Sequence, residues 1–154
     1  TLPFRPAEDQ YRLTNEVAPT INPQTTDILV VEDNYVNKLV MEGQLKKLGF
    51  QVFAAGNGKE ALGMLEKQEF DLVFMDCQMP IMDGFEAARR IRQLDNRNAS
   101  VAIIAVTANT NPGDRENCIA AGMNDYIKKP FNQAVLIGAI NRWLSYDSGE
   151  VSPA

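Results

Sequence analysis

Residues 71–84 read DLVFMDCQMPIMDG, and this stretch places a carboxylate at the end of a strongly apolar run. Leu72–Met75 have the character of a strand buried in a core, and Asp76 follows them directly. A buried carboxylate without partners is energetically costly. Asp76 therefore either marks the point where the strand reaches the surface or is held at the rim of the core for its chemistry.

Similar apolar runs recur along the chain, separated by longer stretches with helical spacing. Continuous apolar runs are typical of strands buried on both faces, as in parallel sheets. Strands that alternate with helices predict an α/β fold with a doubly wound, five-stranded parallel sheet and five helices. The predicted strands are Ile28–Val31, Val52–Ala55, Leu72–Met75, Val101–Val106 and Met123–Ile127, and the predicted helices cover 34–48, 57–67, 85–94, 112–122 and 131–144.

The two ends of the chain differ in composition from this alternating pattern. Residues 1–26 are polar, contain prolines and show no clear period, which predicts a linker or N-terminal arm. Residues 147–154 form a polar tail. The folded domain is therefore predicted to cover residues 27–146.

Composition excludes several classes of function. Of the 154 residues 45% are apolar, which is enough for a sizeable core. The net charge of −5 does not suit nucleic-acid binding, because modules that bind nucleic acid are usually basic. No apolar run approaches the ~20 residues that span a bilayer, so no membrane contact is expected. The chain has no histidine, which excludes Ser-His and Cys-His catalysis and histidine-ligated metals. Cys77 and Cys118 lack metal-binding spacing, which favours reduced thiols in the cytosol.

Charged and polar residues follow the predicted strands at the point where each strand ends. Glu32 and Asp33 follow the first strand, Asp76 the third, Thr107 the fourth and Lys129 the fifth. Because sites in open α/β sheets form outside the carboxyl ends of the strands, these side chains are expected to converge. Two like charges ~4 Å apart repel by ~4 kcal/mol at an effective dielectric of 20, so such a cluster requires compensation.

A hard divalent cation compensates such a cluster, because Mg²⁺ takes carboxylates, waters and phosphate oxygens as ligands. Lys129 neutralises part of the remaining charge. This combination suits phosphoryl transfer, in which positioning and charge neutralisation do most of the work. A carboxylate can itself be the nucleophile and form an aspartyl phosphate, and Asp76 is best placed for this role.

The motifs ILVVEDN, FMDCQMPIMDG, AVTAN and YIKKPF stand in the order and spacing of one known family. Through them, residues 27 to about 146 resemble the receiver domain of two-component response regulators, a flavodoxin-like fold with strand order 2-1-3-4-5. The resemblance implies that Asp76 is the phosphoacceptor. It also implies that Glu32, Asp33, Asp76 and the backbone carbonyl of Gln78 bind Mg²⁺ or Mn²⁺.

The same resemblance implies roles for three residues near the acceptor. Thr107 is expected to bond a phosphoryl oxygen, and Lys129 to pair with the phosphoryl group. Tyr126 is expected to be a switch aromatic that follows Thr107, although a static, half-buried tyrosine is the alternative. Pro130, after the lysine, is commonly preceded by a cis peptide bond in the family.

The sequences VEDNYVNKLV and NGKEAL more specifically resemble receivers fused to hybrid sensor histidine kinases. This implies a phosphorelay, in which Asp76 takes a phosphoryl group from a phosphohistidine and passes it to a histidine phosphotransfer domain. The predicted partners are that domain and the kinase dimerisation domain, with no nucleic acid. The fragment itself is then no enzyme, and it is cytoplasmic even where the parent chain is anchored in the inner membrane.

A docking surface for these partners is predicted on the first helix, beside the acidic cluster. Tyr35 and Leu39 lie at spacing i and i+4, away from the side that faces the sheet, with Val36 at the margin. Pro130 is assigned to the same docking role. The side predicted to face the sheet carries Val40, Met41, Leu45 and Leu48.

Other interpretations were compatible with parts of this pattern. A stand-alone single-domain response regulator would carry the same site. A haloacid-dehalogenase-type phosphatase also uses an aspartate and Mg²⁺, but it requires a second aspartate where this chain has Gln78. A flavodoxin-like binder would need a phosphate-cradling loop after the first strand, and here that loop is acidic. Glu32 and Asp33 alone would also suit the start of a helix.

Overall fold

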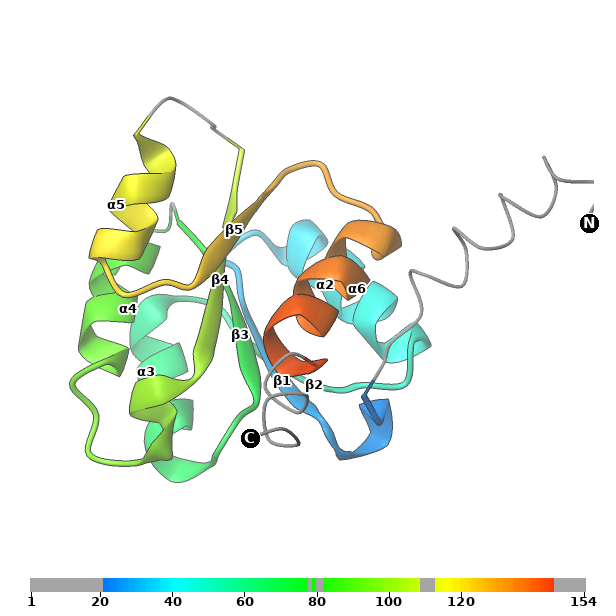
Figure 1. Ribbon diagram of the computed structural model, residues 1–154, viewed down its shortest axis with the longest axis horizontal. Helices are drawn as coiled ribbons and strands as arrows, with labels where there is room; N and C mark the ends of the chain where they lie inside the picture. The colour runs from blue at the N-terminus through cyan, green and yellow to red at the C-terminus, as the bar shows by residue number, and fades with distance from the viewer. Residues whose placement is uncertain (1–20, 78, 80–81, 109–112, 146–154) are drawn as a thin grey trace, which may run out of the picture.

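The computed structural model describes residues 21–77, 79, 82–108 and 113–145, and these form a five-stranded parallel sheet with helices on both faces (Figure 1). The strand order is β2-β1-β3-β4-β5. This confirms the predicted doubly wound fold and its strand order. The strands are β1 (Asp27–Val31), β2 (Gln51–Ala55), β3 (Leu72–Asp76), β4 (Ala102–Thr107) and β5 (Asp125–Lys128).

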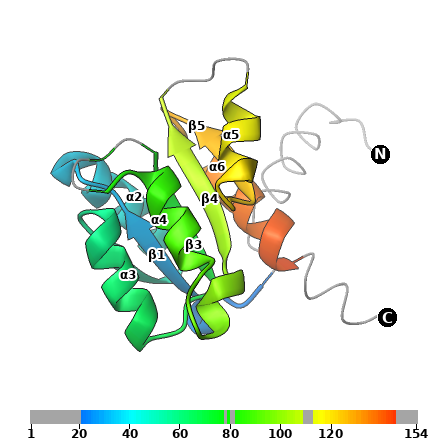
Figure 2. The ribbon, with the colours of Figure 1, turned by 90° about the vertical axis from the view of Figure 1, so that its left-hand side faces the viewer.

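Two helices pack on one face of the sheet and three on the other (Figures 1 and 2). Helices α2 (Tyr35–Lys47) and α6 (Gln133–Ile140) share the first face. Helices α3 (Gly58–Lys67), α4 (Gly84–Ile91) and α5 (Asp114–Ala120) cover the second. Two short 3-10 helices, η1 (Pro23–Thr25) and η2 (Arg97–Ser100), precede β1 and β4. A single π-helical turn, η3 (Asn141–Ser145), continues α6.

Most of these helices begin at a capping side chain that the sequence supplies. Asn34, Asn57, Asp83 and Asn132 each accept a hydrogen bond from the backbone N–H three residues on. Such caps satisfy backbone donors that have no partner within the helix. They therefore fix where α2, α3, α4 and α6 begin, close to the carboxyl ends of the strands. Residue 112, where the predicted helix 112–122 begins, lies outside the described residues.

The core consists of two apolar layers, one on each side of the sheet. The central strand β3 is buried along its whole length, with Leu72, Val73, Phe74 and Met75 fully inaccessible. Alternate residues of the strand point into the two layers. The apolar run Leu72–Met75 therefore forms the central strand, and Asp76 is the last residue of that strand.

The side of α2 that faces the sheet differs from the prediction at one residue. Met41 and Leu45 are buried and Leu48 packs partly against the core, as predicted. Val40 is 50% exposed, so its assignment to the sheet-facing side was wrong. Met41 and Leu45 lie in one i, i+4 row, whereas Val40 lies about 100° round the helix from Met41 and falls outside that row.

Part of the predicted arm packs against the domain. Ile21 contacts the core layer under α2 and α6, Thr26 is buried, and the carbonyl of Thr26 accepts a hydrogen bond from the Gln51 N–H at 3.1 Å. We therefore propose that the folded unit starts near Ile21. Residues 1–20 of the predicted arm, and the predicted tail at 147–154, lie outside the described residues.

Candidate phosphoryl-acceptor site

The carboxyl ends of the strands meet at one edge of the sheet, and the predicted site residues lie there. Asp76 and Thr107 are the last residues of the adjacent strands β3 and β4. Glu32 directly follows β1, and its N–H continues the ladder to the Ala55 carbonyl at 3.1 Å. Glu32, Asp76 and Thr107 are all buried. Two carboxylates and a hydroxyl are therefore buried where the core meets the carboxyl edge of the sheet.

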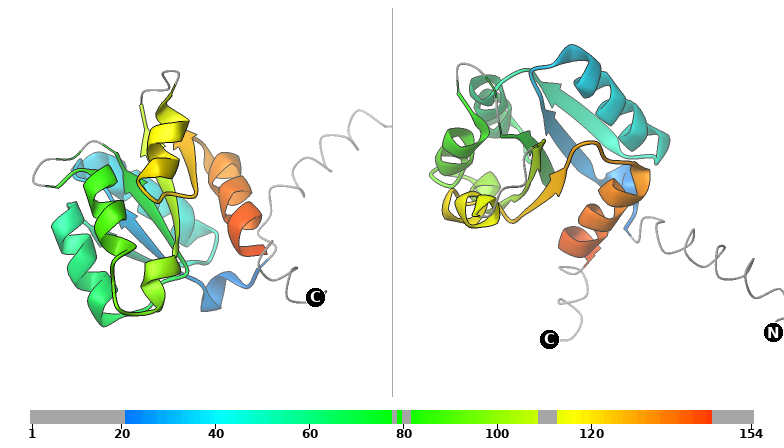
Figure 3. Two further views of the ribbon diagram at one scale, coloured as in Figure 1. Left: turned by 60° about the vertical axis from the view of Figure 1, so that its left-hand side comes forward. Right: turned by 90° about the horizontal axis from the view of Figure 1, so that it is seen from above.

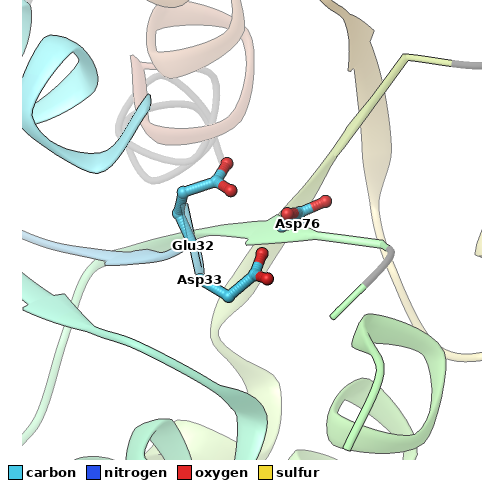
Figure 4. Close-up of side chains that lie close together, drawn as sticks. All are labelled: Glu32, Asp33 and Asp76. Carbon is cyan, nitrogen blue, oxygen red and sulfur yellow. The ribbon is translucent and has the colours of Figure 1, made fainter. Parts of the chain in front are cut away.

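Three carboxylates converge at this edge (Figure 4). One oxygen from each of Glu32, Asp33 and Asp76 lies within 4.8 Å of the others. Asp33 is exposed, so the cluster opens to solvent on its side. Three negative groups at this spacing repel strongly, and an oxygen-only donor set of this kind fits a hard divalent cation such as Mg²⁺.

Lys129 supplies the positive charge at the site. Its ammonium nitrogen lies 3.2 Å from Glu32 Oε1 and 3.7 Å from Asp76 Oδ2. The lysine backbone is held as well, because its N–H donates to the Thr107 carbonyl at 2.8 Å. The Lys129–Pro130 peptide bond is cis. The ammonium group is thus anchored between two acids, and the side chain is 23% exposed.

Thr107 and Tyr126 lie on neighbouring strands and on the same side of the sheet. In the register of β4 and β5, Thr107 pairs with Lys128 and Ala105 pairs with Tyr126. Because side chains alternate along a strand, those of Thr107, Ala105 and Tyr126 share one face. Ala105 is small and fully buried, and Tyr126 is half-buried against the same core layer.

The start of α2 connects the site to an exposed apolar surface. The Asn34 N–H donates to Glu32 Oε2 at 3.1 Å, and Asn34 caps the helix. The first two turns then expose four apolar side chains, which we call the α2 surface. They are Tyr35 at 68%, Val36 at 64%, Leu39 at 47% and Val40 at 50% exposure.

Two predicted site residues require separate comment. Pro130 is exposed, as its predicted docking role requires. Gln78, whose carbonyl was predicted as a metal ligand, lies outside the described residues. Sequence reasoning also missed Val40 as a member of the α2 surface. The signal was present, because Val36 and Val40 form a second i, i+4 pair beside Tyr35 and Leu39.

Comparison with protein families gives a match to the response regulator receiver domain over residues 28–141. Curated relatives include hybrid signal transduction histidine kinase B of Dictyostelium discoideum, 38% identical over 87% of this chain and 7% of the relative. Histidine kinase 2 of Arabidopsis thaliana is 43% identical over 75% of this chain and 12% of the relative. The chain thus spans about a tenth of the length of these relatives.

Solved structures with the same fold include the receiver domain of the sensor histidine kinase PA1611 from Pseudomonas aeruginosa, which has a magnesium ion coordinated in its active-site cleft. It is 47% identical, with a TM-score of 0.73 over 78% of this chain and 98% of the other. The Saccharomyces cerevisiae receiver domain of Ssk1, solved with the histidine phosphotransfer protein Ypd1, is 31% identical. Its TM-score is 0.75 over 83% of this chain and 94% of the other.

Proposed function

The chain belongs to the family of response regulator receiver domains, and we propose that Asp76 is its phosphoacceptor residue. The observation that carries this proposal is the convergence of Glu32, Asp33 and Asp76 with the ammonium group of Lys129. Among the three acids, Asp76 alone ends the central strand, and it is both buried and within reach of Lys129. The receiver domain itself is a phosphoacceptor and not a catalyst.

In the proposed reaction, a carboxylate oxygen of Asp76 attacks the phosphorus of a phosphohistidine on the side opposite the leaving nitrogen. An O–P bond forms as the P–N bond breaks, and the electron pair goes to the imidazole nitrogen, which takes a proton from solvent. Lys129, already 3.7 Å from Asp76, pairs with an oxygen of the transferred group. Mg²⁺, held by Glu32, Asp33 and Asp76, would neutralise charge on the phosphoryl oxygens, and Mn²⁺ suits the same oxygen ligands.

We propose that Thr107 and Tyr126 respond to this modification. A phosphoryl group on Asp76 offers the Thr107 hydroxyl a new acceptor. Ala105, which pairs with Tyr126, is small, and the space that the Thr107 side chain vacates on turning to the phosphoryl group would admit the tyrosine ring. Only an interaction that differs between the two states shifts their populations, and the new hydrogen bond to Thr107 is such an interaction.

The parent protein is proposed to be a hybrid sensor histidine kinase that acts in a phosphorelay. The similarity to histidine kinases of Dictyostelium discoideum, Arabidopsis thaliana and Pseudomonas aeruginosa supports this over a stand-alone regulator or a phosphatase. The likeness to a receiver solved with a phosphotransfer protein supports such a protein as partner, and the kinase dimerisation domain as phosphoryl donor remains a prediction. The part of the chain that the structure describes contains no helix suited to crossing a bilayer, and the cytoplasmic location remains a prediction.

The first prediction concerns metal-dependent phosphorylation. The protein is incubated with acetyl phosphate and Mg²⁺, and its intact mass is followed with time. We expect the mass to rise by one phosphoryl group, because charge neutralisation dominates phosphoryl transfer. Excess EDTA is expected to prevent the change. Modification at an equal rate with and without the divalent ion would contradict the proposed function.

The second prediction concerns the α2 surface. Tyr35 and Leu39 are replaced together by serine, and transfer from a phosphorylated histidine phosphotransfer protein of the same organism is measured. We expect the transfer rate to fall at least about tenfold, because removing apolar anchors from an interface centre costs roughly 1–2 kcal/mol or more. Phosphorylation by acetyl phosphate should be unchanged, since both side chains point to solvent.

A matched control for this experiment removes apolar side chains that are exposed elsewhere. Ile119 on α5 and Val135 on α6 are 53% and 40% exposed, and their double serine variant should transfer at the unaltered rate. If both double variants slow transfer equally, the effect is not specific to the α2 surface. If neither does, the partner docks on another face.

A further inference from the structure

Gly84, the first residue of α4, lies in direct contact with the backbone of the proposed phosphoacceptor. Its N–H donates to the Cys77 carbonyl at 3.1 Å, and the residue is buried. A Cβ atom at this position would lie 2.3 Å from the Asp76 carbonyl oxygen and 2.9 Å from Cys77 Cα. The backbone of Gly84 is not in the left-handed region, so glycine is required here for space and not for conformation.

Helix α4 has little freedom to retreat from this contact. It lies between α3 and α5 on its face of the sheet (Figure 3). Its own residues Ala87, Ala88 and Ile91 are completely buried in the core layer on that face. Side-chain rearrangement in so tightly packed a layer is costly, because interiors are packed to crystal-like density.

The far end of α4 is anchored by Arg92, its C-cap residue. The guanidinium donates to the Gly122 carbonyl at 2.8 Å, the Val101 carbonyl at 2.7 Å and Asn124 Oδ1 at 2.9 Å. Burial lowers the pKa of Arg92, but a guanidinium remains protonated in proteins. A methyl group added at Gly84 therefore presses on the strand end that carries Asp76, because the helix that bears it is anchored at its other end.

We propose that Gly84 is a positioning residue for the phosphoacceptor: its missing side chain sets where the end of β3, and hence the Asp76 carboxylate, lies relative to Glu32 and Asp33. The contact acts through the backbone of Asp76, and Gly84 itself touches neither metal nor phosphoryl group. This inference rests on the proposed function of Asp76. It assigns to the start of α4 a role in metal affinity as well as in folding.

The test compares Gly84→Ala with the unaltered protein in Mg²⁺ affinity and in the rate of phosphorylation by acetyl phosphate. NMR titration with MgCl₂ gives the dissociation constant. We expect affinity and rate each to fall at least about tenfold, because misplacement by ~1 Å can reduce rates ~100-fold. Equal values in the two proteins would overturn the inference. If the unaltered protein itself takes no phosphoryl group, the proposed function fails instead.

A second glycine variant, strained at a position away from the site, separates positioning from general destabilisation. Gly49 follows α2 with φ of +100° and lies at the opposite end of the sheet, so Gly49→Ala strains the fold without touching the site. At a temperature where both variants are folded, Gly49→Ala should bind Mg²⁺ as the unaltered protein does. If it loses affinity to the same extent, Gly84 acts only through stability.

A second pair of variants adds no volume and is needed if Gly84→Ala does not fold. Asp83 caps α4 by accepting from the Glu86 N–H at 2.9 Å, and Asn caps about as well as Asp whereas Ala does not. Asp83→Ala should therefore bind Mg²⁺ severalfold more weakly than Asp83→Asn, because both lose the charge but only the first loosens the start of the helix. Identical affinities of the pair would contradict the positioning role.

Discussion

Asp76→Asn is expected to abolish phosphorylation while leaving the fold intact. The amide is nearly isosteric with the carboxylate, but its nitrogen and oxygen lack the negative charge that makes the acid a nucleophile. Asp76 is buried at the end of the central strand and lies 3.7 Å from the Lys129 ammonium, and we expect no other acid of the cluster to accept the group in its place. The variant is incubated with acetyl phosphate and Mg²⁺, and its intact mass is measured. It should carry no phosphoryl group even after many times the half-time for phosphorylation of the unaltered protein.

The variant should also be at least as stable as the unaltered protein in the absence of divalent ions. Removing one of three carboxylates that lie within 4.8 Å of one another relieves repulsion, and this is expected to offset the loss of the Asp76–Lys129 ion pair at 3.7 Å, since Lys129 keeps Glu32 as its closer partner. Thermal unfolding in EDTA checks this and shows that loss of phosphorylation is not loss of folding. Phosphorylation of Asp76→Asn at a rate near that of the unaltered protein would assign the acceptor to another residue.

Asp33→Asn is expected to have opposite effects on metal affinity and on stability. At an effective dielectric of 20, a carboxylate ~4 Å away attracts a cation by about 4 kcal/mol for each unit of the cation's charge, and a water ligand recovers a large part of this for Mg²⁺. A net loss of roughly 3 kcal/mol corresponds to a roughly hundredfold weaker affinity for Mg²⁺. Calorimetric titration with MgCl₂ measures the change.

Without metal, the same variant should be more stable by about 1 kcal/mol at most, because Asp33 is exposed and exposed charge pairs contribute roughly 0–1 kcal/mol. Asp95→Asn is the matched control, since Asp95 is an exposed acid beyond the far end of α4 and the net charge changes equally. If both variants lose affinity alike, the effect reflects overall charge. If neither does, Asp33 is not a ligand.

Much of the site could be predicted from the sequence because a parallel sheet obeys a simple rule. Carboxyl ends of adjacent strands share one edge, so residues after apolar runs must meet there. Glu32, Asp76 and Thr107 follow this rule, and the structure buries all three at that edge. The positions of the strands and of α2 and α3 agreed to within a residue or two, because their apolar runs and asparagine caps are clear local signals.

Other features depend on packing between segments that are distant in the sequence, and no local pattern reports them. The exposure of Val40 depends on which i, i+4 row of α2 meets the sheet. The packing of Ile21 against the core layer depends on where the polar arm crosses the domain. The contact of Gly84 with the Asp76 backbone joins a helix start to a strand end across an intervening loop. From the sequence, this region was assigned only as the start of the predicted helix 85–94.

The central claim is that Asp76 carries the phosphoryl group, and chemical trapping of the modified residue tests it most directly. Borohydride reduces an acyl phosphate to an alcohol, so a phosphorylated aspartate becomes homoserine and can be located by peptide mass spectrometry. After treatment with acetyl phosphate and Mg²⁺, we expect homoserine at Asp76 and unmodified acids at Glu32 and Asp33. Homoserine at another aspartate, or none in a protein whose intact mass shows a phosphoryl group, would contradict the claim.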